Sequence, residues 1–194
     1  MNNDKETYKD IYDKIQEKPI IPKKSYPLNQ EKVREYLKNT EESIRSILKK
    51  LFDNTTHISY RTFKFVLYNN FKELIHYCKV RNIGVISLYL ASIDHNNITH
   101  KSNFWVAQHL YQYLKKNKIN IKLNIIYNMN DIKYLDEKDL ILILDDCSYT
   151  GTQIYSTLHK ISYVNKQKIA IYILVAFITN EAIEYIKTLM YKNN

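Results

Sequence analysis

The sequence predicts an α/β protein: a three-layer domain with a mainly parallel sheet, preceded by an N-terminal helical extension. Runs rich in apolar and β-branched residues indicate strands at 83–91, 119–127, 139–144 and 168–178. Their continuous apolar composition is typical of parallel strands covered on both faces. Segments of helical periodicity follow three of the strands, at 103–116, 152–163 and 180–191. Strands that alternate with helices indicate a layered α/β sheet.

The N-terminal part of the chain has a helical pattern instead. Residues 4–17 predict a short amphipathic helix, and three prolines then predict an extended linker: Pro19, Pro22 and Pro27. Apolar spacing predicts one long helix over 29–52 and another over 59–78, with Ser59 as N-cap. We therefore expect a helical extension with a proline-containing linker over 1–57 and the α/β domain over 58–194.

The composition excludes several classes of protein. Only two of the 194 residues are glycine, Gly84 and Gly151, where average usage of ~7% would give about 14. Sites built on several glycines, such as the dinucleotide-binding fingerprint, are therefore excluded. The two cysteines form no C-x-x-C pair. The sequence does not open with an apolar stretch. The longest apolar run, 169–178, is shorter than the about 20 residues that span a bilayer. We expect a cytoplasmic protein with no membrane partner.

The net charge of +9 is unevenly distributed. Residues 1–82 hold 17 Lys and Arg against 11 Asp and Glu, and residues 83–194 hold 12 against 9. This excess fits attraction for a polyanion or a phosphorylated substrate, and it also fits solvated helix faces rich in lysine. The sequence has no Arg-rich run and no aromatic RNA-binding motif, so nucleic acid stays a weakly supported partner.

The most informative stretch is LILILDDCSYTGTQIYSTL, residues 140–158. An apolar strand leads into Asp145 and Asp146, and a short polar loop containing Gly151 leads into a helix. Ligands of open α/β sheets bind beyond the carboxyl ends of the strands. Amides of a tight turn before a helix form a cradle for an anion, and glycine lets the backbone approach closely. Carboxylates suit hydroxyl groups or a divalent cation, so the combination fits a sugar phosphate.

This stretch resembles the signature of the type I phosphoribosyltransferase family, in which a strand, two acids and three variable residues precede Thr-Gly. Thr150-Gly151-Thr152 matches the pattern, and Gln153 stands where the family usually has Thr. The resemblance implies that Asp145 and Asp146 are catalytic and hold the 2′ and 3′ hydroxyls of phosphoribosyl pyrophosphate. It implies that the loop holding the 5′-phosphate comprises Cys147, Ser148, Tyr149, Thr150, Gly151, Thr152 and Gln153.

The resemblance, which covers roughly residues 58–180, also implies the rest of the site. The pyrophosphate loop would follow the first strand and include Ser92, Lys101 and Ser102. Mg²⁺ would bridge the pyrophosphate and the ribose hydroxyls, with Asp145 and Asp146 as candidate ligands. The family's flexible lid lies before the signature strand, where this chain offers only residues 128–138, a short segment for excluding water.

We expect a phosphoribosyltransferase-like protein that transfers ribose 5-phosphate from phosphoribosyl pyrophosphate to an unidentified nitrogenous base. One alternative is a non-catalytic regulatory protein of the same fold that binds phosphoribosyl pyrophosphate or a nucleotide. A second is a basic module that binds RNA or a protein through its N-terminal helices. Members of the family often pair, so a homodimer is a further expectation.

Overall fold

A computed structural model describes residues 13, 16–17, 29–53, 58–89, 102–126 and 128–192 of the chain. The chain divides into two compact units, Ile21–Val66 and a larger unit of Met1–Ile20 with Leu67–Asn194. The larger unit contains the sheet.

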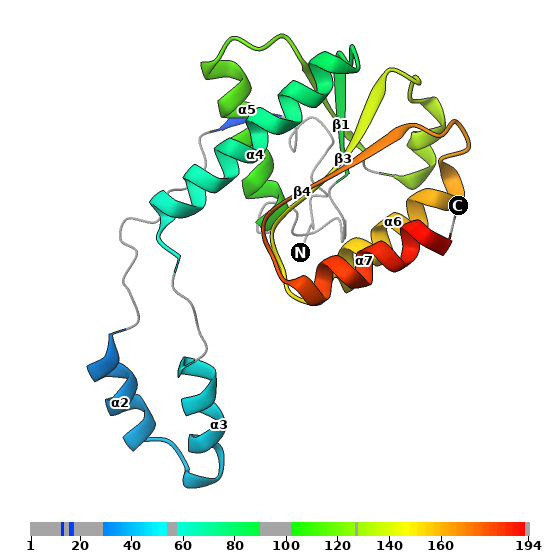
Figure 1. Ribbon diagram of the computed structural model, residues 1–194. Helices are drawn as coiled ribbons and strands as arrows, with labels where there is room; N and C mark the ends of the chain where they lie inside the picture. The colour runs from blue at the N-terminus through cyan, green and yellow to red at the C-terminus, as the bar shows by residue number, and fades with distance from the viewer. Residues whose placement is uncertain are drawn as a thin grey trace, which may run out of the picture. The chain divides into compact units, whose positions relative to one another are not determined.

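The sheet has four parallel strands in the order β2-β1-β3-β4 (Figure 1). They are β1 (Val85–Tyr89), β2 (Lys122–Ile126), β3 (Asp139–Ser148) and β4 (Ala170–Ile178). Residues 140–144 of β3 are all buried, since this strand has a neighbour on each side and helices cover both faces. The predicted α/β class with a parallel sheet is confirmed.

Helices form the two outer layers of this unit (Figure 1). α4 (Tyr60–Val80) and α5 (Ser102–Lys116) pack together through aromatic side chains, with the rings of Tyr68 and Tyr113 5.2 Å apart. On the other face, α6 (Thr152–Val164) and α7 (Asn180–Lys192) share a core with β3. At the edge strand β4, the Asn70 side chain of α4 donates to the carbonyl oxygen of Val175 at 3.1 Å.

The predicted helices and strands of residues 59–191 are confirmed in type and order, with differences in extent; β2, for example, begins at Lys122 and not at residue 119. Ser59 caps α4 as expected, since its Oγ accepts from the Thr62 N–H at 3.1 Å. The predicted strand 139–144 continues through Ser148, because residues 145, 147 and 148 still pair with the long strand β4. Asp145 and Asp146 are therefore strand residues. The helix expected over 4–17 falls almost entirely outside the described residues.

The prediction of a single long helix over 29–52 is wrong. Two helices replace it, α2 (Gln30–Lys38) and α3 (Glu42–Asp53). Asn39 ends α2, the Thr40 hydroxyl donates to the Tyr36 carbonyl at 2.8 Å, and the Arg45 side chain donates to the Thr40 carbonyl at 2.9 Å. Asn and Thr offer the backbone local hydrogen bonds that compete with a continuous helix, and the apolar period hides this break.

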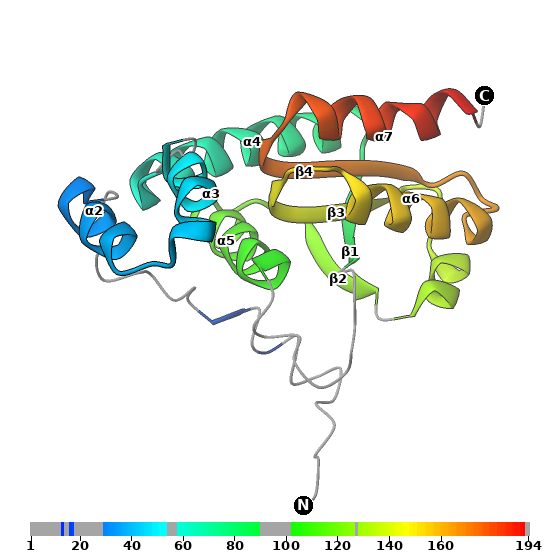
Figure 2. The ribbon, with the colours of Figure 1, turned by 90° about the horizontal axis from the view of Figure 1, so that it is seen from below.

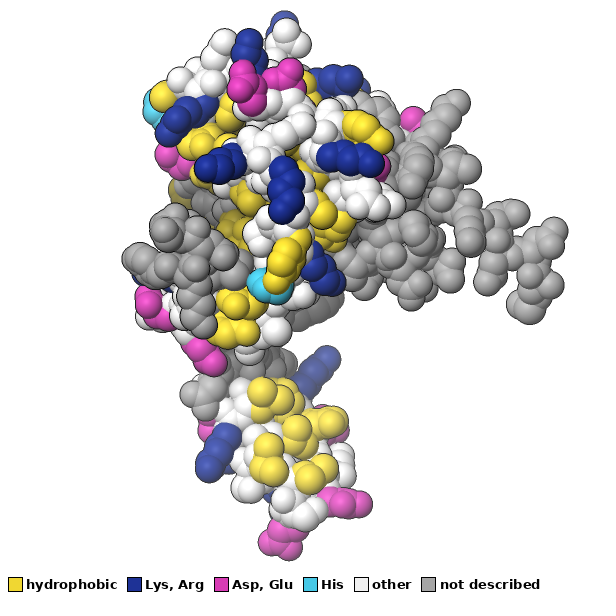
Figure 3. Space-filling view, turned by 90° about the vertical axis from the view of Figure 1, so that its right-hand side faces the viewer, with side chains coloured by type: hydrophobic (Ala, Val, Ile, Leu, Met, Phe, Trp, Pro, Cys, Tyr) yellow, Lys and Arg dark blue, Asp and Glu magenta, His cyan; other side chains and the backbone are white. Residues whose placement is uncertain are grey.

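The helices α2 and α3 form a hairpin with little core of its own, because neither contains a buried residue. Ile47 is 65% exposed and Leu51 59% exposed. Figure 3 shows apolar side chains gathered on part of this surface, and on the larger unit it shows Lys and Arg spread among apolar and neutral side chains. Among the described residues, no helix is long and apolar enough to cross a membrane.

Candidate phosphate-binding site

The sheet has a topological switch point between β1 and β3. These strands are neighbours, yet the chain leaves β1 towards α5 on one face and leaves β3 towards α6 on the other. Such a divergence opens a crevice at the carboxyl ends of the two strands, where open α/β sheets bind their ligands. The carboxyl end of β3 contains both aspartates of the sequence motif, so the fold places them beside this crevice.

Asp145 is a nearly buried carboxylate, with 8% of its surface exposed. Its Oδ1 accepts from the Asp146 N–H at 3.0 Å and from the Ser102 hydroxyl at 3.1 Å. Burial, followed by the hydrogen bond to the Asp146 side chain, raises the pKa of Asp145 to about 6, and the Ser102 hydroxyl opposes this rise. A hydroxyl donor or a cation that binds beside such a carboxylate, poorly solvated and close to a second acid, would stabilise its negative charge.

The next two residues of β3 are half-buried. The Asp146 Oδ1 accepts from the Cys147 N–H at 2.9 Å. Burial and the neighbouring Asp146 charge raise the pKa of the Cys147 thiol, so this cysteine is not an activated nucleophile. The predicted residues Asp145, Asp146 and Cys147 are thus brought together at the strand end, and the chemistry available there is that of two carboxylates.

The loop that follows turns sharply into α6. Gly151 has φ +74° and is the N-cap of the helix. A Cβ at this position would lie 2.7 Å from the Ala182 carbonyl oxygen of α7, so the turn needs glycine both for its dihedral angle and for space. The hydroxyls of Thr150 and Thr152 lie 3.0 Å apart and are exposed, and Gln153 is also exposed. Hydroxyls and helix N–H groups at one turn suit a phosphate.

Thr179 is a residue of this site that the sequence analysis missed. It links the end of β4 to α7, and its Oγ accepts from the Ala182 N–H at 3.1 Å. Its hydroxyl donates to the Tyr149 carbonyl, and its N–H donates to the Ser148 carbonyl at 3.1 Å. A Thr placed directly before a helix with Glu181 in its first turn is an N-cap signal, which could have located the residue but not its contact with the loop.

Part of the expected pyrophosphate loop is present at the site. Ser102 reaches Asp145 from the first residue of α5. Ser92 and Lys101 lie outside the described residues, and their predicted role stays a prediction.

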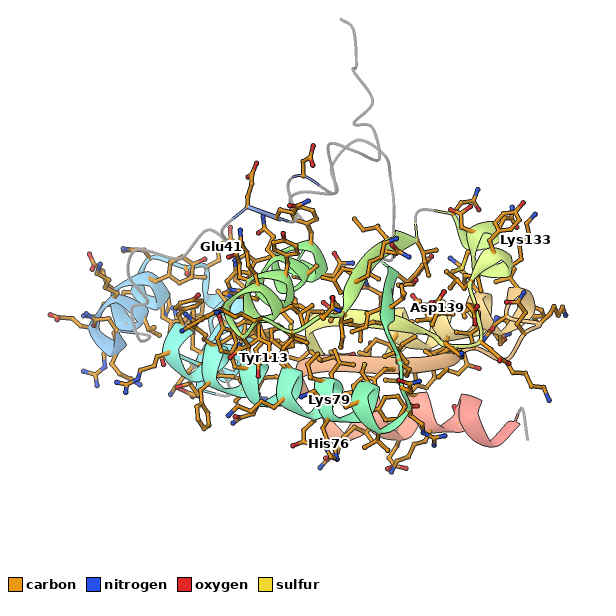
Figure 4. The ribbon with its side chains drawn as sticks, turned by 90° about the horizontal axis from the view of Figure 1, so that it is seen from above. Glu41, His76, Lys79, Tyr113, Lys133 and Asp139 are labelled. Atoms are coloured by element: carbon orange, nitrogen blue, oxygen red, sulfur yellow. The ribbon has the colours of Figure 1, made fainter. Side chains whose placement is uncertain are left out.

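The segment expected as a short lid is a packed element. Residues 129–134 form the 3-10 helix η2 (Met129–Tyr134), in which Ile132 is 1% exposed. The Gln167 side chain donates to the Lys133 carbonyl at 2.9 Å, just before β4 begins. η2 therefore packs beside α6 and near the start of β4, away from the carboxyl end of β3 where the site lies (Figure 2). In Figure 4, Lys133 of η2 and Asp139 at the start of β3 lie towards the same end of the molecule.

The two carboxylates of the site fit a magnesium ion that is shared with a phosphorylated substrate. Within the part of the chain that the structure describes, no group of three or more His, Cys, Asp and Glu side chains could hold a metal ion. Asp145 and Asp146 offer carboxylate oxygens, the donors that Mg²⁺ prefers, and phosphate oxygens of a substrate would complete its shell. The residues thus fit a metal that arrives with a phosphorylated ligand.

A parallel sheet with an acid pair and a glycine-containing turn at its switch point is the arrangement expected of a phosphoribosyltransferase-type protein. The chain belongs to the PRTase-CE family, whose model matches residues 28–194 and so includes both units.

Among solved structures, the chain is similar to the purine phosphoribosyltransferase from Pyrococcus horikoshii Ot3. The two share 12% sequence identity with a TM-score of 0.37, over 63% of this chain and 83% of that chain. A likeness of this extent does not establish the family, which rests on the family model. No curated protein matches the chain significantly.

Proposed function

We propose that this protein binds phosphoribosyl pyrophosphate and transfers its ribose 5-phosphate to a nitrogenous base. The observation that carries the proposal is the convergence, at one strand end, of the acid pair Asp145–Asp146 and the turn at Gly151. The acids suit ribose hydroxyls, and the turn with its helix N-terminus suits a phosphate. A sugar phosphate is the ligand class that needs both kinds of group side by side.

The proposed reaction breaks the bond from C1′ to the pyrophosphate oxygen and forms a bond from C1′ to a nitrogen of the base, which loses a proton. Asp145 and Asp146 accept hydrogen bonds from the 2′ and 3′ hydroxyls and so fix the ribose. The loop from Tyr149 to Thr152 holds the 5′-phosphate. Mg²⁺, when bound with the substrate, would stabilise the charge of the leaving pyrophosphate. No protein nucleophile is required, which agrees with a Cys147 thiol of raised pKa.

Calorimetric titration of the full chain with phosphoribosyl pyrophosphate, with and without Mg²⁺, tests the binding step. We expect Mg²⁺-dependent binding that is lost in the double variant Asp145→Asn/Asp146→Asn. The matched control is Asp136→Asn/Glu137→Gln, a second adjacent acid pair that is exposed near the opposite end of β3. Failure of both phosphoribosyl pyrophosphate and nucleoside monophosphates to bind at millimolar concentration would contradict the proposal.

One observation favours a second candidate, a non-catalytic protein that binds phosphoribosyl pyrophosphate or a nucleotide. The segment 128–138, where the family has its lid, is packed against α6 and near the start of β4 instead of over the site. Release of pyrophosphate, measured with a panel of purine, pyrimidine and other bases, separates the two. Release with any base establishes the transferase, and binding with no release from the whole panel establishes the second candidate.

A further inference from the structure

Thr179, which follows β4, holds the end of β3 and the start of the phosphate loop. Thr179 binds two consecutive carbonyl groups of the loop: its N–H donates to Ser148 O at 3.1 Å, and its hydroxyl donates to Tyr149 O. In a regular strand, consecutive carbonyls point to opposite sides. Here both point towards Thr179, so the chain curls at the end of β3.

The orientation of two carbonyls fixes the orientation of two amides. Every described peptide bond is trans, and in a trans peptide the N–H points opposite to the C=O of the preceding residue. The N–H groups of Tyr149 and Thr150 must therefore both point away from Thr179. Because β3 lies between β4 and β1, the side away from Thr179 is the side of β1, where the crevice lies.

Two successive N–H groups that point to one side form an anion-binding concavity. We infer that Thr179 is the positioning residue of the phosphate loop: by binding the carbonyls of Ser148 and Tyr149, it turns the amides of Tyr149 and Thr150 towards the 5′-phosphate of the ligand. The identity of that ligand rests on the proposed function, whereas the effect on the loop does not.

The support behind Thr179 is itself rigid. Its Oγ accepts from the Ala182 N–H at 3.1 Å and so caps the first turn of α7. The same turn contacts Gly151, where the Ala182 carbonyl leaves no room for a Cβ. The loop is therefore fixed at Tyr149 by the hydrogen bond from Thr179, and at Gly151 by close packing against the first turn of α7.

The test uses three variants of the full chain. Thr179→Val removes the hydroxyl but keeps the shape and the N–H, and Thr179→Ser keeps the hydroxyl. Thr188→Val is the matched control, since its hydroxyl lies on α7, the helix that Thr179 caps, and donates to the Tyr185 carbonyl at 2.6 Å within that helix. Thermal unfolding of all three shows whether an effect on the loop is local.

Two readouts decide the inference separately from the proposed function. Without ligand, alkylation of Cys147 reports loop mobility, and Cys78 is silent because it is fully buried and burial raises its pKa to about 11. We expect Thr179→Val to accelerate Cys147 alkylation several-fold, and Thr179→Ser and Thr188→Val to leave it near the wild-type rate. With ligand, we expect Thr179→Val to weaken the binding of phosphoribosyl pyrophosphate about tenfold, which is the effect of one lost hydrogen bond.

The inference is overturned if Thr179→Val alkylates Cys147 at the wild-type rate and binds phosphoribosyl pyrophosphate with wild-type affinity. It is also overturned if Thr179→Val and Thr188→Val have equal effects. If the wild-type chain binds no phosphoribosyl pyrophosphate, the proposed function fails, and the alkylation rates still decide whether Thr179 shapes the loop.

Discussion

Replacing Asp145 by asparagine should stabilise the folded protein at neutral and alkaline pH. The carboxyl is 8% exposed and its pKa is raised to about 6, against about 3.9 in an unfolded chain. Between these two values the folded state binds more protons than the unfolded state. Stability therefore falls as the pH rises through this window, and the full penalty is present above pH 6.

The magnitude follows from the two pKa values. A difference of about two powers of ten in proton affinity, at 1.36 kcal/mol each, sets an upper limit of ~3 kcal/mol. Residual solvent access lowers this figure, and we expect about 1–2 kcal/mol. The asparagine carbonyl can still accept from the Ser102 hydroxyl and the Asp146 N–H, so the variant keeps the hydrogen bonds that hold this side chain.

Denaturant unfolding of the wild-type chain and Asp145→Asn at pH 4.5 and pH 8 measures the effect. The variant should be the more stable protein at pH 8, with a difference from wild type about a third as large at pH 4.5, while it loses binding of phosphoribosyl pyrophosphate. Glu137→Gln removes one negative charge from an exposed side chain and is the matched control. A variant that is less stable than wild type at pH 8, or a difference that does not change with pH, would refute the reasoning.

Three further predictions test other parts of the structure. Gly151→Ala should destabilise the fold by about 2 kcal/mol or more in denaturant unfolding, because φ is +74° and the Cβ would meet Ala182 O at 2.7 Å. Gly84→Ala is the control: this glycine has open space around it, and its substitution should change the free energy of unfolding by no more than about 1 kcal/mol. Mass spectrometry after alkylation should find Cys147 modified first and Cys78 modified only on unfolding; equal rates would contradict the burial of Cys78. Ile132→Ala should cost about 2–5 kcal/mol, and a neutral result would mean that η2 is not part of the core.

The periodic parts of the fold could be predicted because burial repeats along the chain. The strands and helices of residues 59–191 each have a face that must be covered, and their type and order follow from it. Local hydrogen bonds of Asn39 and Thr40 cause the break between α2 and α3. The spacing of apolar residues therefore did not reveal this break. The extension of β3 through Ser148 depends on the strand beside it, and polar residues such as Asp145 obscured it.

The residues of the site likewise divide into those that the sequence could locate and those that it could not. Asp145, Asp146 and Gly151 belong to one contiguous motif with a spacing that has chemical meaning, so the sequence could locate them. Thr179 lies 30 residues from Tyr149, and no local pattern connects the two. The contact between Ser102 and Asp145 likewise spans 43 residues. Long-range contacts of this kind depend on which strands are neighbours, and the sequence does not order the strands.

The position of η2 bears on how catalysis could occur at this site. A transferase of the proposed kind must keep water from a ribose carbon that develops positive charge, which the family achieves with a lid. To act as that lid, η2 would have to withdraw Ile132 from the core and release Gln167 from the Lys133 carbonyl. Burying such an aliphatic side chain is worth about 1.5–3 kcal/mol, and the movement would lose this contribution. Any cover over the site is therefore expected to come from a different segment, and a site left open to water would bind the ligand without protecting its reacting carbon.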